Sequence, residues 1–129
     1  MSTTDGANHS FIFSKRSLLN LEGVHPTLVR LSHRALQISS VDFVVTEGLR
    51  TIERQRELVA IGASETLHSK HLTGRAIDVA AYVGGSVTWE WKYYEAIAKA
   101  FKQAAREEGV EIVWGGDWTT LKDGPHFQI

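Results

Sequence analysis

Two short segments hold the residues whose types and spacing are best suited to chemistry. The first, residues 69–78, reads Ser-Lys-His-Leu-Thr-Gly-Arg-Ala-Ile-Asp and contains His71 and Asp78. On one continuous strand these two side chains would project from opposite faces, because side chains alternate along a strand. A two-residue hairpin at Gly74-Arg75 would instead place them opposite each other on the same face. A loop that delivers His71 beside a strand bearing Asp78 would serve as well.

The second segment, Asp123-Gly124-Pro125-His126, lies close to the end of the sequence. Gly-Pro imposes a bend, which fixes the backbone between an acid and a histidine. Two histidines and one carboxylate suit zinc and leave a fourth position for water. Bound zinc lowers the pKa of its water to about 7, so that hydroxide is available at neutral pH. The sequence therefore offers His71, Asp78 and His126 as ligands of a catalytic zinc ion.

A zinc hydrolase also needs a carboxylate that takes the proton of the water and passes it to the leaving amine. Asp123 is the first choice because it lies three residues from a proposed ligand, and Asp117 is the alternative. Arg50 follows a strand and a glycine, and its guanidinium could bind a substrate carboxylate or a developing oxyanion. It could equally be a surface arginine at the start of a helix.

The six histidines leave the choice of ligands open on spacing alone. His68 competes directly, because His68 and His71 would face the same ion at helical spacing. His9 lies in the predicted leader and His25 precedes a proline, so both are interpreted as structural or incidental, and His33 is expected at the surface of a predicted helix. Asp78 could merely form an ion pair with Arg75.

The elements that must position these residues can be predicted from periodicity and turn residues. Pro26 is suited to the first position of a helix. Thr51 and Thr88 are candidate N-caps, and Gly84-Gly85 is a predicted turn. The predicted helices are 26–39, 52–60 and 89–108, and the predicted strands include 41–45, 110–114 and 126–129. The closing strands are too near each other in sequence for parallel crossovers. This order predicts a small α+β domain with a mostly antiparallel sheet and packed helices.

Composition narrows the function classes. The 129 residues suffice for one domain, with residues 1–10 predicted as a flexible leader and 11–129 as the functional domain. A net charge of −1 with scattered basic residues argues against nucleic-acid binding. No apolar run is long enough for a membrane span or the core of a signal peptide. The absence of cysteine excludes thiolate metal sites and a cysteine nucleophile.

The motif Ser69-x-His71-x-x-Gly74-x-Ala76-x-Asp78, followed by Asp123-x-x-His126, resembles the signature of zinc peptidases that include D-alanyl-D-alanine carboxypeptidases and dipeptidases. More narrowly, the chain is similar to short phage endolysins that act as L-alanyl-D-glutamate peptidases. The resemblance extends from about residue 11 to residue 129. Its supporting segments are residues 46–51, Gln55, 62–64, 82–85 and the Trp-Gly-Gly-Asp-Trp block at 114–118.

The resemblance implies roles for five residues. His71, Asp78 and His126 would be the zinc ligands, Asp123 the catalytic acid/base and Arg50 a contact to the substrate or transition state. His68 falls outside the family pattern. Many members of the superfamily carry Glu where this chain has Asp123, and Asp has a shorter reach, which keeps Asp117 open as the alternative.

The resemblance further implies a hedgehog/D-alanyl-D-alanine-peptidase-like fold and a lytic enzyme that hydrolyses the L-Ala–D-Glu bond of peptidoglycan stem peptides. Such an enzyme is expected to be a monomer that stays in the host cytoplasm and reaches the periplasm and cell wall after a holin opens the inner membrane. Two other functions stay open. One is a D,D-carboxypeptidase or dipeptidase that releases terminal D-Ala, and the other is a zinc-stabilised binding module without activity.

Overall fold

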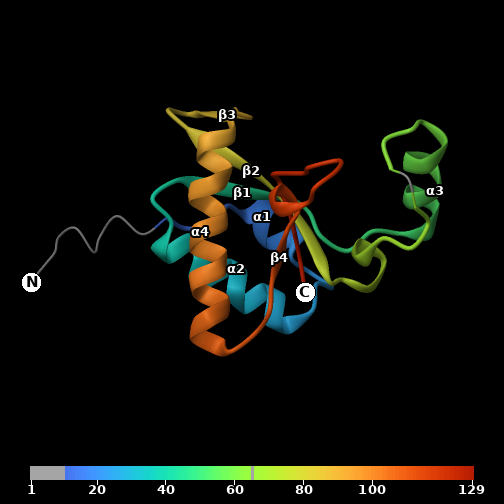
Figure 1. The fold of residues 1–129 in the computed structure, drawn as a ribbon. Helices are drawn as coiled ribbons and strands as arrows, with labels where there is room; N and C mark the ends of the chain where they lie inside the picture. The colour runs from blue at the N-terminus through green and yellow to red at the C-terminus, as the bar shows by residue number, and fades with distance from the viewer. Residues whose placement is uncertain (1–10, 65) are drawn as a thin grey trace, which may run out of the picture.

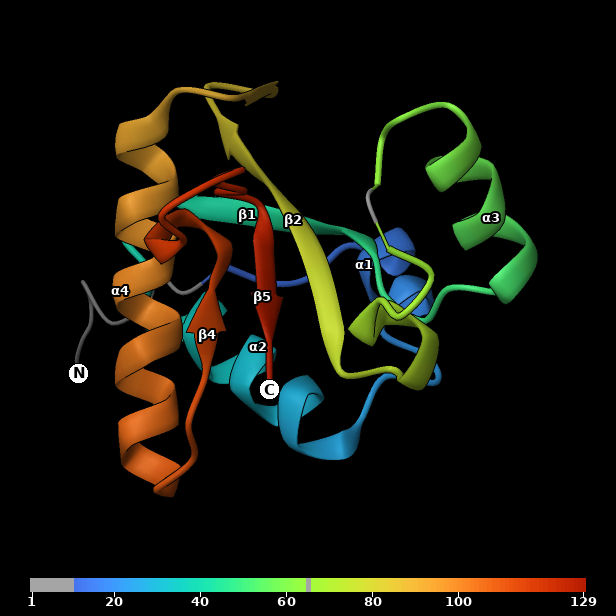
Figure 2. The ribbon, with the colours of Figure 1, turned by 45° about the vertical axis from the view of Figure 1, so that its right-hand side comes forward.

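A five-stranded antiparallel sheet forms the framework of the computed structural model, which describes residues 11–64 and 66–129 (Figure 1). The predicted leader 1–10 lies outside the described residues. The strands are β1 (Asp42–Glu47), β2 (Ala76–Val83), β3 (Ser86–Thr88), β4 (Val113–Trp114) and β5 (His126–Gln128). Their order is β1-β2-β5-β4, and β3 pairs with the outer end of β2 through the turn at Gly84-Gly85. The long β2 is therefore central, with β1 on one side and β5 on the other (Figure 2).

In the part of the chain that the structure describes, four α-helices accompany the sheet: α1 (Lys15–Asn20), α2 (Pro26–Ile38), α3 (Ile52–Ala60) and α4 (Trp91–Glu108). Two short 3-10 helices, η2 (Lys70–Thr73) and η3 (Gly115–Asp117), interrupt the connections. Helices α2 and α4 pack against each other, and α3 stands apart from both (Figures 1 and 2). Within the described part of the chain, no helix combines the length and apolar character needed to cross a membrane.

Aromatic side chains hold the sheet to the helices. Phe43 of β1 and Phe101 of α4 are almost fully buried, with ring centroids 5.5 Å apart. Phe127 of β5 stacks on Phe101 with centroids 4.1 Å apart. Tyr94, Ile97, Ala98, Phe101 and Ala105 are all buried on one side of α4. This core anchors β5, whose first residue is His126, against α4.

The fold class is confirmed, and two helices match their predictions closely. Helix α2 begins at Pro26, and α3 covers residues 52–60, with the Thr51 hydroxyl accepting a hydrogen bond from the Arg54 N–H at 3.1 Å. The predicted cap at Thr88 is wrong: Thr88 ends β3, and α4 begins only at Trp91. Likewise, the predicted strand 110–114 is reduced to its last two residues.

The hairpin at Gly74-Arg75 is also wrong. Residues 70–73 form η2, which ends at Gly74 with a φ of 70°. The Gly74 carbonyl accepts a hydrogen bond from the His25 N–H at 2.8 Å, and a Cβ on Gly74 would collide with the Gly23 carbonyl. Only glycine fits this left-handed conformation in so close an approach. His71 therefore reaches Asp78 from a short helix that precedes the strand, which is the other arrangement that the sequence allowed.

Candidate metal centre

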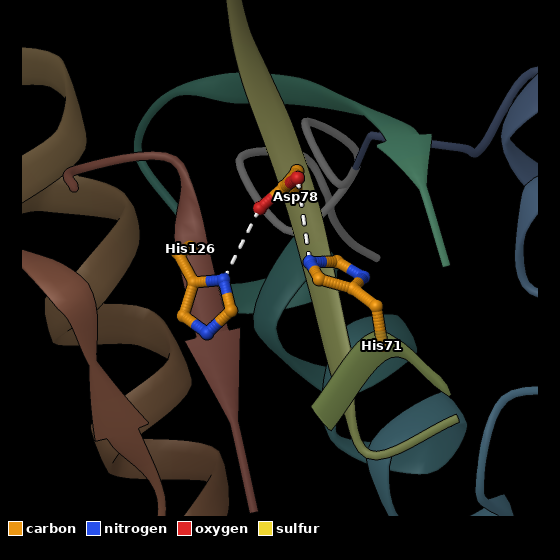
Figure 3. Close-up of side chains that lie close together, drawn as sticks. All are labelled: His71, Asp78 and His126. Atoms are coloured by element: carbon orange, nitrogen blue, oxygen red, sulfur yellow. Dashed lines mark hydrogen bonds and ion pairs between the residues drawn. The ribbon is translucent and has the colours of Figure 1, made fainter. Parts of the chain in front are cut away.

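His71, Asp78 and His126 meet at the middle of the sheet, each delivered by a different element (Figure 3). His71 lies on η2, Asp78 on β2 and His126 at the start of β5. Asp78 and His126 are directly opposite in the antiparallel register of β2 and β5. Directly opposed residues project from the same face of a sheet, so the register alone brings these two side chains together.

The distances within this cluster match those of a ligand set. Nε2 of His71 lies 3.4 Å from Oδ2 of Asp78, and Nδ1 of His126 lies 3.3 Å from Oδ1 of Asp78. One donor atom from each residue lies within 4.8 Å of the other two. His71 and His126 are buried, whereas the Asp78 side chain is 24% exposed. The cluster is thus closed toward the core and open on one side.

Hydrogen bonds to the outer ring nitrogens fix which nitrogens face the centre. The Nδ1–H of His71 donates to the Gly48 carbonyl at 2.8 Å, since a carbonyl can only accept. The Nε2–H of His126 donates to Oε1 of Gln128 at 2.8 Å. Such outer partners orient metal-bound histidines and set their tautomer. The nitrogens left to face the centre are Nε2 of His71 and Nδ1 of His126.

This arrangement leaves acceptors facing one another. Within residues 11–64 and 66–129, no donor hydrogen-bonds to the buried Nε2 of His71, whose nearest polar neighbour is the Asp78 carboxylate. A buried polar atom without a partner is costly. A cation among the three side chains would satisfy all of them at once, and a two-histidine, one-carboxylate set with an open side suits zinc. The chain's own geometry therefore fits a metal ion.

Charge coupling within the cluster agrees with this fit. Burial acts to raise the pKa of Asp78, but the hydrogen bond from His126 and the nearby imidazole of His71 outweigh it and hold that pKa well below its usual value. Burial acts to lower the pKa of His126, yet the hydrogen bond and negative charge of Asp78 raise it overall. The Asp78 carboxylate thus favours a positive charge beside it, which is the charge that a bound cation would supply.

A cleft of about 760 Å³ opens over the cluster. One wall comes from α3 and the loop after it, and another from the segment around η2. The facing side comes from the residues between η3 and β5. The side chains that line the cleft include Leu58, Ser64 and Thr66 on the first wall, His68, Ser69 and Lys70 on the second, and Trp118, Leu121 and Asp123 on the facing side. The open side of the cluster is therefore the floor of a cleft that has room for an extended peptide.

Asp123 lines this cleft and is half-buried, whereas Asp117 is not among its lining residues. The Asp123 N–H donates to the Gly115 carbonyl at 3.0 Å, which fixes the start of the turn leading to His126. Burial raises the pKa of Asp123, and the negative charge of Asp78 raises it further. Asp117 points elsewhere and forms an ion pair with Lys102 of α4 at 2.7 Å. Of the two carboxylates, Asp123 is therefore the one that faces the cleft, and its role as the acid/base stays a prediction.

Arg50 lies beside the cluster, but most of its donors are occupied. Its guanidinium binds both carboxylate oxygens of Glu47 and donates from Nη1 to Oε1 of Gln55 at 2.7 Å. Nη2 also lies 3.7 Å from Oδ2 of Asp78, and the side chain is only 8% exposed. The predicted contact of Arg50 with substrate stays a prediction. What the structure adds is a link from Arg50 to a proposed metal ligand.

The other candidates from the sequence separate clearly. His68 is exposed at the cleft and lies outside the cluster of His71, Asp78 and His126. His25 is the N-cap of α2, with its Nδ1 accepting a hydrogen bond from the Thr27 N–H. Trp118 lines the cleft, with its ring centroid 5.2 Å from that of His126, whereas Trp114 is buried.

Sequence reasoning missed three side chains around the cluster, namely Glu47, Gln55 and Gln128. Gln128 could have been found, because it lies two residues after His126 on a strand and so shares its face. Glu47 and Gln55 belong to the segments that support the family resemblance, but neither spacing nor periodicity indicates that they reach the site.

The family profile described as "Phage L-alanyl-D-glutamate peptidase" matches residues 9–127. The chain belongs to this family. It is 38% identical over 118 residues to the L-alanyl-D-glutamate peptidase of Escherichia phage T5, which covers 88% of this chain and 86% of that protein. It is 30% identical over 129 residues to the peptidoglycan L-alanyl-D-glutamate endopeptidase CwlK of Bacillus subtilis, covering 82% of this chain and 73% of that one.

A solved structure shows the same fold. The crystal structure of the Serratia marcescens L-Ala D-Glu endopeptidase ChiX is 55% identical and superposes with a TM-score of 0.89. The match covers 96% of this chain and 93% of that chain. Family membership and fold therefore agree with the resemblance inferred from the His71, Asp78 and His126 motifs.

Proposed function

We propose that this chain is a zinc-dependent endopeptidase of the endolysin type, which hydrolyses the L-Ala–D-Glu bond of peptidoglycan stem peptides. The observation that carries the proposal is the convergence of Nε2 of His71, the Asp78 carboxylate and Nδ1 of His126 on the floor of an open cleft. The printed names of the phage T5, Bacillus and Serratia relatives support the substrate class.

His71, Asp78 and His126 would hold the ion, and Gly48 and Gln128 would keep the two rings in the required tautomers. When bound in such a set, zinc polarises the scissile carbonyl and makes water nucleophilic at neutral pH. The donor set also suits other divalent transition metals, among which availability as well as affinity selects. Zinc is the proposed metal because it is d¹⁰ and tolerates a tetrahedral site with one open position.

Asp123 supplies the proton transfers. Its carboxylate takes a proton from the attacking water and then gives it to the amine nitrogen of D-Glu as the amide bond breaks. The raised pKa of Asp123 suits both halves of this cycle, because the carboxyl group must accept a proton and release it again. Arg50 holds Asp78 and the adjacent cleft wall, and its positive charge favours the anionic character that develops at the cleft floor.

The proposal includes the route to the substrate. The chain would accumulate in the host cytoplasm and reach the wall after a holin opens the inner membrane. The family description and the T5 relative both name phages, which supports this route.

The direct test is mass spectrometry of purified peptidoglycan after digestion, with and without a chelator. We expect muropeptides that end in L-Ala, together with released peptides that begin with D-Glu. The chelator should abolish both products, and added zinc should restore them. Free D-Ala as the main product would instead indicate a D,D-carboxypeptidase. Unchanged wall in the presence of bound zinc would indicate a binding module.

A further inference from the structure

Helix α3 and the loop after it form a projecting arm whose attachment differs from that of the other elements. Residues 52–64, here called the α3 arm, stand away from the sheet and from α2 and α4 (Figures 1 and 2). Gln55 is the one buried residue among the nine of α3, all of which the structure describes, and it is fully buried. Ile52 and Ile61 of the arm are exposed, Ile61 at 72%, and Leu58 and Val59 are half-buried. The one fully buried side chain of α3 thus carries an amide and not an apolar group.

Both the oxygen and the nitrogen of the Gln55 amide form hydrogen bonds. Its Oε1 accepts from Nη1 of Arg50 at 2.7 Å. Its Nε2 donates to the Ser64 hydroxyl at 2.9 Å and to the Thr66 carbonyl. The Gln55 side chain therefore links α3 to the loop that follows it. It also connects the arm to the Arg50 guanidinium, which lies beside the cluster of His71, Asp78 and His126. A buried network with every member satisfied gives a single well-defined arrangement.

Arg50 connects Gln55 to the cluster of His71, Asp78 and His126. Its guanidinium lies 3.7 Å from Oδ2 of Asp78, and its backbone N–H donates to the carbonyl of His71 at 2.9 Å. The arm contributes Leu58 and Ser64 to the cleft wall. A continuous chain of contacts thus runs from the cleft wall through Gln55 and Arg50 to two proposed metal ligands.

We propose that Gln55 is a positioning residue, which sets the α3 arm as the substrate-binding wall of the cleft and holds Arg50 toward Asp78. The proposal rests on the proposed function for its kinetic consequences. Gln55 itself does not line the cleft and need not touch the substrate. Its amide is required because Arg50 needs an acceptor while Ser64 and Thr66 offer acceptors that need a donor. A side chain that only accepts hydrogen bonds satisfies Arg50 but not Ser64 and Thr66. An apolar side chain satisfies none of the three.

Three substitutions distinguish the contribution of the Gln55 amide oxygen from that of its amide nitrogen. Gln55→Glu keeps an acceptor for Arg50 and loses the donor to the Thr66 carbonyl. Ser64→Ala removes the hydroxyl that accepts from Nε2 of Gln55, and with it one polar group of the cleft wall. Gln55→Met keeps the length and loses both links. Arg56→Met is the matched control, because Arg56 is the next residue of α3 and is exposed.

The readouts are zinc content, hydrogen exchange of the arm with zinc alone, and kcat and KM on a soluble stem peptide. For Gln55→Met we expect about one zinc ion per chain and faster exchange of backbone amide hydrogens across residues 56–64. We also expect kcat/KM to fall by about tenfold or more, as it does when other groups that orient metal ligands from outside the coordination shell are removed. Gln55→Glu and Ser64→Ala should raise KM while kcat stays close to that of the wild type. Arg56→Met should match the wild type throughout.

Wild-type kcat/KM in Gln55→Met, or an unchanged KM in both Gln55→Glu and Ser64→Ala, would overturn the positioning role. If Gln55→Met fails to fold, the other two variants decide the matter. A wild-type protein that binds zinc but leaves the stem peptide intact would refute the proposed function instead. In that case the exchange measurement still decides whether Gln55 fixes the arm.

Discussion

The sheet that carries Asp78 and His126 and the α3 arm beside the cleft are held in place by different interactions. Phe43, Phe101 and Phe127 lock β1 and β5 to α4 through close ring contacts. The arm relies on the hydrogen bonds of Gln55. Close-packed apolar contacts are costly to disturb, whereas a hydrogen bond contributes only about 0.5–1.5 kcal/mol net. Two of the three proposed ligands, Asp78 and His126, therefore lie on the rigid sheet, whereas one wall of the cleft lies on the part of the molecule that opens most easily.

The largest effect should come from the ligands. Replacement of His71, Asp78 or His126 by Ala should remove bound zinc and lytic activity together, because two remaining ligands hold the ion poorly. Metal analysis and a turbidity assay on whole walls measure both. His68→Ala is the control and should keep both properties. Full zinc content in His126→Ala would show that the sheet does not carry the site.

The next largest effect concerns proton transfer. Asp123→Asn should lower kcat by about 10²–10⁴-fold, the usual contribution of a general acid–base, and leave zinc content unchanged. Asp117→Asn should be close to the wild type, because Asp117 is engaged with Lys102 away from the cleft. Kinetics on a soluble stem peptide distinguish the two, and the reverse result would restore Asp117 as the acid/base.

A third pair of substitutions compares the two regions by stability. Phe101→Ala should lower the free energy of unfolding by about 3–5 kcal/mol, since it leaves a cavity between Phe43 and Phe127. Ile61→Ala, on the arm, should change it by no more than about 0.5 kcal/mol because the side chain is exposed. Urea denaturation followed by tryptophan fluorescence measures both values. Equal losses would mean that the arm has an apolar core of its own.

The smallest effect requires no mutation. Backbone amides of α3 should exchange with solvent through local opening, while those of α4 around Ile97 and Phe101 should exchange only near global unfolding. Hydrogen–deuterium exchange with peptide-level resolution tests this difference in the zinc-bound protein. Similar protection in the two helices would remove the contrast between the regions.

The sequence predicts that His71, Asp78 and His126 lie together, and it predicts most of the helices, but not the path of the chain between these residues. His71 and Asp78 could be paired through either a hairpin or a loop, and the choice depended on the packing of Gly74 against Gly23, which is distant in sequence. Thr88 has the right residue type for a cap, but pairing with Ala81 of β2 claims it for a strand.

Gln55 was the least predictable member of the site. Periodicity identifies buried apolar residues, and a buried glutamine on a polar helix follows no such pattern. Its environment consists of Arg50, Ser64 and Thr66, which only the fold assembles around it. Polar networks of this kind depend on exact partners, so residue type alone does not reveal them.

The partner of His71 also has a consequence for how the site can change. Its hydrogen bond goes to a backbone carbonyl, which no point mutation deletes, and any side chain at Gly48 would collide with the Asn20 carbonyl. The partner of His126 is a side chain, Gln128, which is only half-buried. Laboratory selection for altered metal affinity should therefore leave position 48 untouched and yield its variants at position 128.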